Sequence, residues 1–311
     1  MKKAINTAFG DLDKISIVEV EIPVLGNNEV LVKVTAAGLN PKDIMVRKGK
    51  FKRLSGSTFP QNIGYDFAGT IENPNKSDFK KGTPVFGMLN GWRGGCCAEY
   101  VNVKLDEFYE MPENVSFEAA AGISLAGQTA LQAIRNLGQL KEGAQILING
   151  ASGGVGTLAI QIAKELGGVV TTVSSSKNLN LCQSFGADDT VSYQEVNIPD
   201  LEVRFDVFFD VFGNYSYKKI SHLLTPTGRY VTTVPKPAIF REQFFNLFRR
   251  KKAKMVIVKS NKKDLAWFHE KMKQDKVKPV VDKVFTLAEI KEAQAYISSK
   301  RAKGKVILKI D

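Results

Sequence analysis

The stretch Gln145-Ile-Leu-Ile-Asn-Gly-Ala-Ser-Gly-Gly-Val-Gly-Thr-Leu-Ala-Ile-Gln-Ile-Ala-Lys164 decides the fold of this chain. It opens with the apolar run Ile146-Leu147-Ile148, which is typical of a buried strand, and then breaks into glycines. Apolar residues such as Leu158 and Ile162 follow at helical spacing. A strand, a tight glycine turn and a helix in this order present free backbone N–H groups and the positive end of a helix to a phosphate.

The glycines of this stretch have the spacing of a dinucleotide-binding turn. Gly154-Val155-Gly156-Thr157-Leu158-Ala159 fits the pattern G-x-G-x-x-G/A, and further glycines precede it where the backbone must approach a pyrophosphate. The alternative is a glycine turn without a ligand, but the strand before it and the helix after it favour dinucleotide binding. The residues expected to contact the cofactor here are Gly150, Ser152, Gly153, Gly154, Val155 and Gly156.

Composition bounds the class of protein. The 311 residues are enough for two domains, and 43% hydrophobic with 24% charged residues is ordinary for a soluble globular protein. We expect no membrane-spanning helix and no secretory signal, because no long apolar run exists and the N-terminus soon turns polar. Cys96, Cys97 and Cys182 give no disulfide framework, so a cytoplasmic location is expected. The net charge of +12 suits an anionic ligand, a nucleic acid or an acidic membrane alike.

The first third of the chain has the pattern of a β-rich domain. Period-two alternation and turn residues predict short strands over Ile15–Ile22, Glu29–Thr35, Gly64–Ile71 and Ala98–Val103. Many short strands without intervening helices indicate a compact barrel or sandwich.

After Pro112 strands alternate with helices. We expect helices over Phe117–Ala121, capped by Ser116, and over Leu125–Leu137. Further predicted strands are Val169–Val173, Thr190–Tyr193, Asp206–Val211, Gly228–Val234 and Lys305–Ile310, with helices over Asn178–Phe185 and Leu287–Ser298. This rhythm predicts an α/β fold with a doubly wound parallel sheet.

The residues after the second strand of the dinucleotide unit indicate which cofactor it binds. An NAD-binding unit usually has a carboxylate there that holds the ribose 2′-hydroxyl. Here the strand runs into Ser174-Ser-Ser-Lys-Asn178, which contains hydroxyls and a cation that suit a 2′-phosphate. NADP(H) is therefore favoured over NAD(H), although the serines also suit an ordinary turn and helix cap.

Zinc is not expected. The chain has two histidines, His222 and His269, and neither forms a ligand-spaced motif with Cys96 and Cys97. Without a Lewis acid, a hydride is expected to go to an acceptor that is already electrophilic, such as a quinone or a C=C bond conjugated to a carbonyl.

Motifs spread over nearly the whole chain carry a family resemblance. They are Gly38-Leu-Asn-Pro-Lys-Asp43, Gly64-Tyr-Asp-Phe-Ala-Gly69, Gly94-Gly95 with Ala98-Glu-Tyr100, Leu125-Ala-Gly-Gln-Thr-Ala130, Gly150-Ala-Ser-Gly-Gly-Val-Gly156, Phe185-Gly-Ala-Asp188 and Gly304-Lys-Val-Ile-Leu308. In this order they resemble the zinc-independent medium-chain dehydrogenase/reductases, most of all the quinone oxidoreductase branch, which includes zeta-crystallin and the alkenal and enone reductases.

The resemblance implies an architecture and an activity. A GroES-like catalytic domain (residues 1–121 and 262–311) is expected around a Rossmann domain (residues 122–261), with NADPH in the cleft between them and a homodimer as the assembly. The implied reaction is hydride transfer from NADPH to an enone, or alternatively to a quinone. A third alternative is a weakly catalytic NADPH-binding protein that acts through a membrane, RNA or protein partner.

The resemblance also implies roles for single residues. Asn40 is expected beside the nicotinamide and the substrate carbonyl, although an Asn before Pro41 is also a natural turn former. The other implied cofactor contacts are Thr129 and Val234 at the nicotinamide, Phe212 and Gly213 at the adenosine ribose, and Ser174, Ser175, Lys177 and Tyr193 at the 2′-phosphate. Tyr193 is alternatively a core residue. Ile44-Met45 stands where several quinone reductases have a tyrosine, so water is the expected proton donor.

Two further features stay open at this stage. Cys96 and Cys97 either line the substrate pocket or, as we favour, are small packed residues. The segment Ile239–Lys254 places Phe240, Phe244 and other apolar residues on one helical face, with a basic end. It suits a lid or a dimer contact, which we favour, or an interfacial membrane helix. Nucleic acid is a third alternative, without any recognisable motif.

Overall fold

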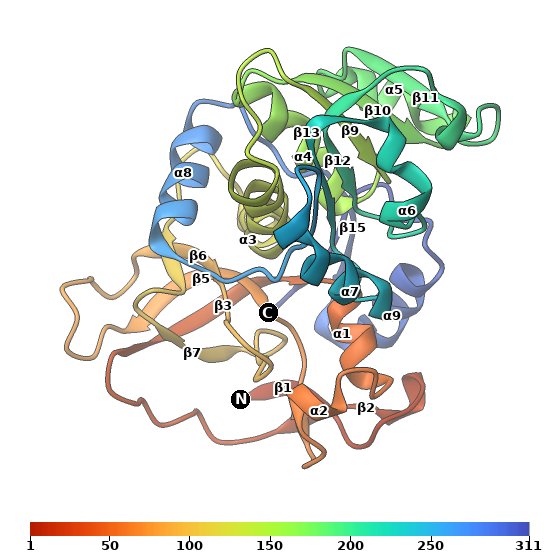
Figure 1. Ribbon diagram of the computed structural model, residues 1–311. Helices are drawn as coiled ribbons and strands as arrows, with labels where there is room; N and C mark the ends of the chain where they lie inside the picture. The colour runs from red at the N-terminus through yellow and green to blue at the C-terminus, as the bar shows by residue number, and fades with distance from the viewer. Residues whose placement is uncertain (311) are drawn as a thin grey trace. The chain divides into compact units, whose positions relative to one another are not determined.

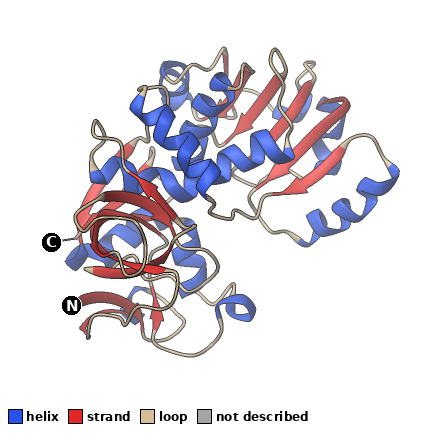
Figure 2. Cartoon of the chain, turned by 90° about the vertical axis from the view of Figure 1, so that its left-hand side faces the viewer, coloured by secondary structure: helices blue, strands red, loops and turns tan. Residues whose placement is uncertain are grey.

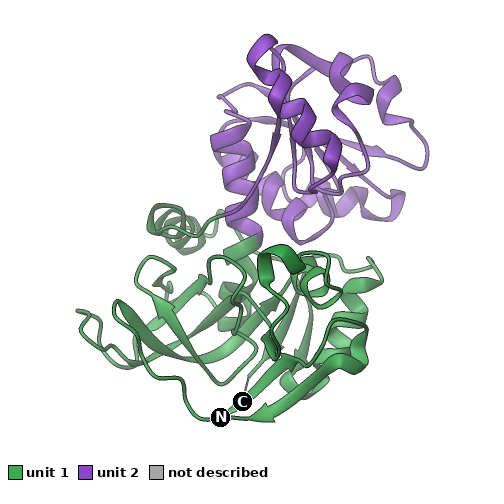
Figure 3. Cartoon of the chain, turned by 60° about the horizontal axis from the view of Figure 1, so that its bottom comes forward, with its two compact units in different colours: residues 1–125, 259–311 green, residues 126–258 purple. Residues whose placement is uncertain are grey.

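Residues 1–310 of the computed structural model are described, and the chain forms two compact units (Figure 3). Unit 1 comprises Met1–Leu125 and Lys259–Asp311, and unit 2 comprises Ala126–Val258. The boundaries expected from the sequence are 121/122 and 261/262. In the structure unit 1 extends further at both boundaries. Backbone N–H groups of residues expected in unit 2 donate hydrogen bonds to side chains of unit 1. The Leu125 N–H donates to Asp66 Oδ1 at 2.7 Å, and the Ser260 N–H donates to Asn90 Oδ1 at 2.7 Å.

Unit 1 contains two sheets (Figure 1). The smaller sheet is antiparallel in the order β2-β1-β4, and the larger one has the path β15-β16-β3-β5-β6-β8, with β7 paired to β3. The strands are β1 (Lys2–Asn6), β2 (Ile15–Glu19), β3 (Glu29–Leu39), β4 (Gln61–Asn62), β5 (Asp66–Asn73), β6 (Pro84–Met88), β7 (Tyr100–Lys104), β8 (Phe108–Glu110), β15 (Val281–Thr286) and β16 (Lys305–Lys309).

The C-terminal strand β16 completes this unit. It pairs antiparallel with β3, so that Ile307 lies opposite Gly38, and parallel with β15. Alternating apolar residues from the two ends of the chain therefore share one core, in which Val32 and Leu308 are fully buried. The helices of unit 1 are α1 (Pro41–Arg47), α2 (Lys52–Ser55), α8 (Lys262–Lys273) and α9 (Ile290–Ser298).

Unit 2 is built on a six-stranded parallel sheet in the order β11-β10-β9-β12-β13-β14. Its strands are β9 (Gln145–Asn149), β10 (Val169–Ser174), β11 (Asp189–Ser192), β12 (Phe205–Asp210), β13 (Leu224–Thr232) and β14 (Lys252–Met255). Helices cover both faces of this sheet (Figure 2). Consecutive residues Ile146, Leu147 and Ile148 are accordingly all fully buried. The predicted doubly wound sheet is confirmed.

The helices of unit 2 correct two expectations. The helices expected over Phe117–Ala121 and Leu125–Leu137 form a single α3 (Phe117–Leu131), which starts in unit 1 and continues as a π-helical turn, Gln132–Leu137. The segment Ile239–Lys254 is not one helix with a basic end. It divides into α7 (Pro237–Phe245), the 3-10 turn Asn246–Phe248 and the edge strand β14. The remaining helices are α4 (Gly154–Glu165), α5 (Leu179–Ser184) and α6 (Tyr217–Ile220).

Candidate functional site

The carboxyl ends of the unit 2 strands bring most of the predicted cofactor residues to one edge of the sheet. Asn149, Val173, Asp210 and Thr232 share the last rung of the central strands, and the predicted residues follow directly after it. The chain runs outward from β9 through β10 to β11 and then returns to β12 on the other side of β9. Ligands of doubly wound sheets bind at such a switch point, outside the carboxyl ends of the strands.

The glycine turn after β9 has the geometry that a pyrophosphate requires. Gly150 has φ +81°, and Gly153 precedes α4 without a side-chain cap among the described residues, so the first amides of α4 are left to a ligand or solvent. A Cβ on Gly156 would lie 2.3 Å from the Gly150 carbonyl oxygen. Only glycine therefore lets the first turn of α4 pack this closely against the loop, and the turn fits a dinucleotide.

The serine turn after β10 lies beside the end of β11. The Tyr193 N–H donates to the Ser174 carbonyl at 3.1 Å, which holds the segment after β11 against the end of β10. Ser174 is buried, Ser175 is half-buried and Lys177 is exposed. Tyr193 is 57% exposed, so the alternative that it is a core residue is wrong. The structure thus gathers the four residues predicted for a 2′-phosphate.

A second tight turn follows β12. Gly213 has φ +73°, and a Cβ there would lie 2.3 Å from Val234 Cγ2, so these two predicted residues are in direct contact. The Cβ of Phe212 lies 3.1 Å from the position of a Cβ on Gly150, which joins this turn to the glycine turn.

A buried carboxylate holds the turn after β12 in place. Asp210 accepts hydrogen bonds from the Gly213 N–H at 2.8 Å, from Asn149 Nδ2 at 2.7 Å and from the Tyr230 hydroxyl at 3.1 Å. Burial raises the pKa of the Asp210 carboxyl, and the donated hydrogen bonds oppose that shift. Thr129, the remaining predicted cofactor contact in unit 2, is 6% exposed on α3.

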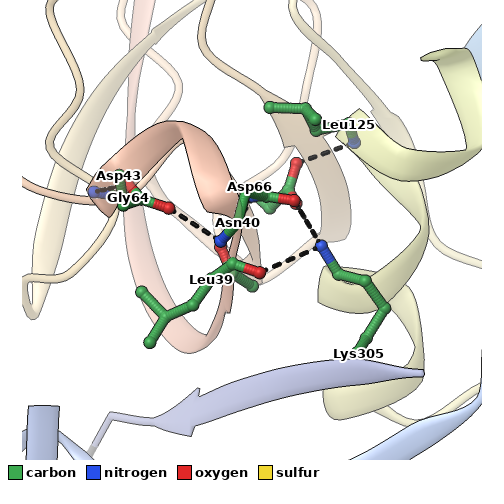
Figure 4. A network of polar contacts seen from close by, with 8 residues as sticks. Leu39, Asn40, Asp43, Gly64, Asp66, Leu125 and Lys305 are labelled. Atoms are coloured by element: carbon green, nitrogen blue, oxygen red, sulfur yellow. Dashed lines mark hydrogen bonds and ion pairs between the residues drawn. The ribbon is translucent and has the colours of Figure 1, made fainter. Parts of the chain in front are cut away.

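In unit 1 the predicted catalytic residue Asn40 lies between β3 and α1 and is 3% exposed (Figure 4). Its Nδ2 donates to Asp66 Oδ2 at 2.9 Å and to the Gly38 carbonyl at 3.3 Å. Its Oδ1 accepts from Lys305 Nζ at 2.6 Å. The amide is thus fully bonded within the unit, and the weakest of its bonds by distance is the one to Gly38.

Two buried charges orient the Asn40 amide. Lys305 Nζ also donates to the Leu39 carbonyl at 3.2 Å and to Asp66 Oδ2 at 3.3 Å, so all three of its hydrogens have acceptors. Burial raises the pKa of the Asp66 carboxyl, and the Lys305 ammonium opposes that shift. The side chain of Lys305 is 4% exposed and that of Asp66 is fully buried.

The next residues along α1 complete this region. Asp43 Oδ2 accepts from the Asn40 N–H at 2.8 Å and its Oδ1 accepts from the Gly64 N–H at 3.0 Å. Burial raises the pKa of Asp43 to about 6. Lys42 Nζ lies 3.6 Å from the centre of the Tyr65 ring and donates to the Gly91 carbonyl, and burial lowers the pKa of Lys42 to about 8.

Sequence reasoning missed Asp66, Lys305 and Asp210 as site residues. The available signal was a charged residue inside an otherwise apolar strand pattern, since such a residue is rarely buried without a partner.

The cysteines and histidines do not form a metal site in the part of the chain that is described. Cys96 and Cys97 are fully buried in the unit 1 core, which confirms the packing interpretation, and burial raises the pKa of both thiols. His222 and His269 each bond a backbone carbonyl, at 2.7 Å and 2.8 Å. Among residues 1–310, His, Cys, Asp and Glu form no group of three or more that is arranged to hold a metal ion.

Both units match known families. The family described as "Alcohol dehydrogenase GroES-like domain" matches residues 26–113, and the one described as "Zinc-binding dehydrogenase" matches residues 185–308. A quinone oxidoreductase structure from Coxiella burnetii superposes with a TM-score of 0.91 at 29% identity, covering 100% of this chain and 99% of that one.

Curated relatives agree with these matches. The chain is 33% identical to the 2-methylene-furan-3-one reductase of Solanum lycopersicum and 32% identical to the NADPH-dependent alkenal/one oxidoreductase, chloroplastic, of Arabidopsis thaliana; each alignment covers 99% of this chain and 79% of the relative. It is 32% identical to the quinone oxidoreductase of Sus scrofa, over 93% of this chain and 92% of the relative. The chain belongs to the quinone oxidoreductase branch of the medium-chain dehydrogenase/reductases.

Proposed function

We propose that this chain transfers a hydride from NADPH to the C=C bond of an α,β-unsaturated carbonyl. The observation that carries the proposal is the likeness over 99% of the chain to relatives named as a 2-methylene-furan-3-one reductase and an alkenal/one oxidoreductase. The glycine turn and the serine turn at one edge of the unit 2 sheet support cofactor binding. Quinone reduction is the second candidate, because relatives from Triphysaria versicolor and Sus scrofa are named quinone oxidoreductases.

The serine turn supports NADPH as the cofactor. Lys177 is exposed and close in sequence to the hydroxyls of Ser174 and Ser175, and no carboxylate follows β10 to repel a 2′-phosphate. We expect Lys177→Ala to raise the KM for NADPH about tenfold and to leave the KM for NADH within about twofold, since a charge-assisted bond to the phosphate contributes about 1.4 kcal/mol or more. An equal effect on both cofactors would place the phosphate elsewhere.

A bound NADPH supplies the hydride, and the chain supplies the hydrogen bond that polarises the acceptor. We propose that Asn40 Nδ2 exchanges its 3.3 Å bond to the Gly38 carbonyl for one to the substrate carbonyl, while Asp66 and Lys305 hold the amide in place. Solvent water then protonates the enolate. We expect Asn40→Ala to lower kcat with NADPH binding retained. Unchanged turnover would remove Asn40 from the mechanism.

The decisive assay follows NADPH oxidation with a simple vinyl ketone and, separately, with a simple quinone. Turnover with the ketone supports the proposal, and turnover with the quinone alone favours the second candidate. Tight NADPH binding without turnover of either would favour a weakly catalytic protein that acts through a partner.

Three further expectations belong to this proposal. We propose that the reaction needs no zinc, in keeping with the donor groups of residues 1–310, and activity that survives a strong chelator is the test. We propose a homodimer, which light scattering of the purified protein tests. We also propose a cytoplasmic location, which cell fractionation tests. No helix among residues 1–310 is long and apolar enough to cross a bilayer.

A further inference from the structure

One fully buried carboxylate joins two turns at the carboxyl edge of the unit 2 sheet. Asp210 is the last residue of β12, and its Oδ1 accepts hydrogen bonds from Asn149 Nδ2 at 2.7 Å and from the Gly213 N–H at 2.8 Å. Asn149 is the last residue of β9 and directly precedes the glycine turn. Gly213 belongs to the turn after β12. The two turns are therefore linked through one oxygen atom.

The other oxygen of Asp210 holds the far end of the turn after β12. Asp210 Oδ2 accepts from the Tyr215 N–H at 3.1 Å and from the Tyr230 hydroxyl at 3.1 Å, and that hydroxyl also donates to the Tyr215 carbonyl at 2.9 Å. Asn149 Nδ2 donates its second hydrogen to Asn214 Oδ1 at 2.7 Å. Side chains of β9, β12 and β13 thus hold three successive positions of this turn.

The bonds to Asp210 require an ionised carboxylate. All four groups that contact its two oxygens donate a hydrogen, and only the ionised side chain is purely an acceptor. An asparagine has the same shape, but it would direct an NH2 group at the donors of one oxygen. Each oxygen faces one backbone N–H, of Gly213 or of Tyr215. Whichever way the amide lies, one backbone contact of the turn is lost.

The turn that Asp210 holds lies between other proposed cofactor contacts. The Cβ of Phe212 lies 3.1 Å from the position of a Cβ on Gly150, and a Cβ on Gly213 would lie 2.3 Å from Val234 Cγ2. A shift of the turn would therefore change its position relative to both neighbours. Groups that bind one ligand together have to be held within about 0.5 Å of the productive geometry, which is the task of the hydrogen bonds behind them.

We propose that Asp210 is a positioning residue for the dinucleotide: its carboxylate fixes the turn after β12 relative to the glycine turn, so that both contact one cofactor molecule. The inference rests on the proposed function, in which the two turns bind the adenosine ribose and the pyrophosphate of NADPH. Asp210 is fully buried behind the turns and acts through them.

The same strand provides a matched control. Asp206 lies near the amino end of β12, where its oxygens accept from the Gln145 N–H at 3.0 Å and from the Thr225 hydroxyl at 2.9 Å. It also joins β12 to β9 and β13, but at the opposite edge of the sheet. D206N therefore makes the same chemical change as D210N in the same strand, away from the proposed cofactor site.

Titration calorimetry of the full chain with NADPH and with NADH tests the proposal. D210N should raise the Kd of both cofactors about tenfold or more and by the same factor within about twofold, because both contain the pyrophosphate and the adenosine ribose. D206N should leave both values within about twofold. In turnover of a vinyl ketone, D210N should raise the KM for NADPH about tenfold and change kcat at saturating NADPH less than about threefold, as expected when only uniform binding is lost.

Two further measurements examine the link between the turns. In the cofactor-free chain, the Gly213 and Tyr215 amides should exchange their hydrogens about tenfold faster or more in D210N and at an unchanged rate in D206N. N149A, which leaves the carboxylate its two backbone donors, should raise the Kd of NADPH about threefold or more. The double variant N149A/D210N should bind NADPH at most about twofold more weakly than the weaker single variant, because the two side chains act through one bond.

The outcomes separate this inference from the proposed function. If the unaltered chain binds NADPH and folded D210N binds it equally well, Asp210 has no positioning role and the proposed function stands. Equal losses of affinity in D210N and D206N would show a general weakening of the sheet and would overturn the inference. If D210N does not fold, N149A decides, and an unchanged Kd there refutes the link. If the unaltered chain binds neither cofactor, the proposed function fails and the inference fails with it.

Discussion

Replacement of Lys305 by methionine is the most informative single change in this chain. Methionine keeps most of the apolar stem and removes only the ammonium group, which is 4% exposed at the start of β16. That group donates to three acceptors: the Asn40 side chain, the Leu39 carbonyl and Asp66. The variant therefore isolates the buried charge from the packing of the strand.

The expected cost follows from what loses its partner. Asp66, fully buried, keeps Asn40 Nδ2 and the Leu125 N–H but loses its counter-charge, while Asn40 Oδ1 loses the donor at 2.6 Å. Removing one member of a buried ion pair lowers the free energy of unfolding by about 3–5 kcal/mol. The cost of the acceptors that lose their donor is included in that range, because these effects are not additive. Lys309→Met, at an exposed position of the same strand, should change the free energy of unfolding by less than about 0.5 kcal/mol.

The cost should depend on pH in one direction. Burial raises the pKa of Asp66 above its unfolded value, so the native state holds this proton more tightly than the unfolded state does. The contribution of that proton to the free energy of unfolding is present at low pH. It is lost as the pH rises from the pKa of Asp66 in the unfolded chain towards its pKa in the folded chain. Without the ammonium the folded pKa rises further, and each unit of that rise is about 1.4 kcal/mol. Lys305→Met should therefore be less destabilised, relative to the unaltered chain, at about pH 5 than at about pH 8.

Tryptophan fluorescence gives a readout confined to unit 1. Both tryptophans of the chain, Trp92 and Trp267, lie there, so urea unfolding followed by their emission avoids the second unit. The double variant D66N/K305M should be less destabilised than the sum of the two single variants, because no charge stays buried alone. If Lys305→Met lowers the free energy of unfolding by less than about 1 kcal/mol, or by the same amount at the two pH values, the reasoning is refuted.

Three further predictions concern other parts of the structure. Gly156→Ala should weaken NADPH binding about tenfold or more, because its Cβ would lie 2.3 Å from the Gly150 carbonyl oxygen. In the control variant Gly153→Ala the new Cβ would lie 3.7 Å from that atom, and circular dichroism should show an unchanged thermal stability. Lys42 should titrate at about 8 in NMR spectra of the reductively methylated chain, and Lys42→Arg should lack that resonance. Asn246→Ala should lower the free energy of opening of β14 by about 1–3 kcal/mol in hydrogen exchange, because two backbone groups lose their partners.

The unit 2 fold, and the sheet edge at which the proposed cofactor residues gather, could be predicted from the sequence because their signals are local. The strand–turn–helix pattern around Gly150 fixes β9 and α4, and parallel strands place the residues after each strand at one edge. The helix prediction failed between Ala121 and Leu125, where two helices are expected from the sequence and the structure has one. Gly122 lies inside the continuous α3, and a Cβ there would make only an ordinary contact, 3.4 Å from Pro279.

The surroundings of Asn40 could not be predicted in the same way. Asp66 and Lys305 are 239 positions apart, and only the pairing of β16 with β3 brings Lys305 beside the residue before α1. Periodicity shows which face of a strand is buried, but it does not show which buried charge meets which. The motif Gly304-Lys-Val-Ile-Leu308 was visible as a pattern, whereas the role of its lysine is a tertiary property.

The division of residues 239–254 shows how such a property changes an interpretation. As one helix, the segment would have an aromatic stripe and a separate basic end. The structure instead turns the chain at Asn246 and adds Lys252–Met255 to the edge of the unit 2 sheet. Strand β14 exists only through its pairing with β13, in which Arg229 lies opposite Lys252, and helical periodicity cannot show such a pairing.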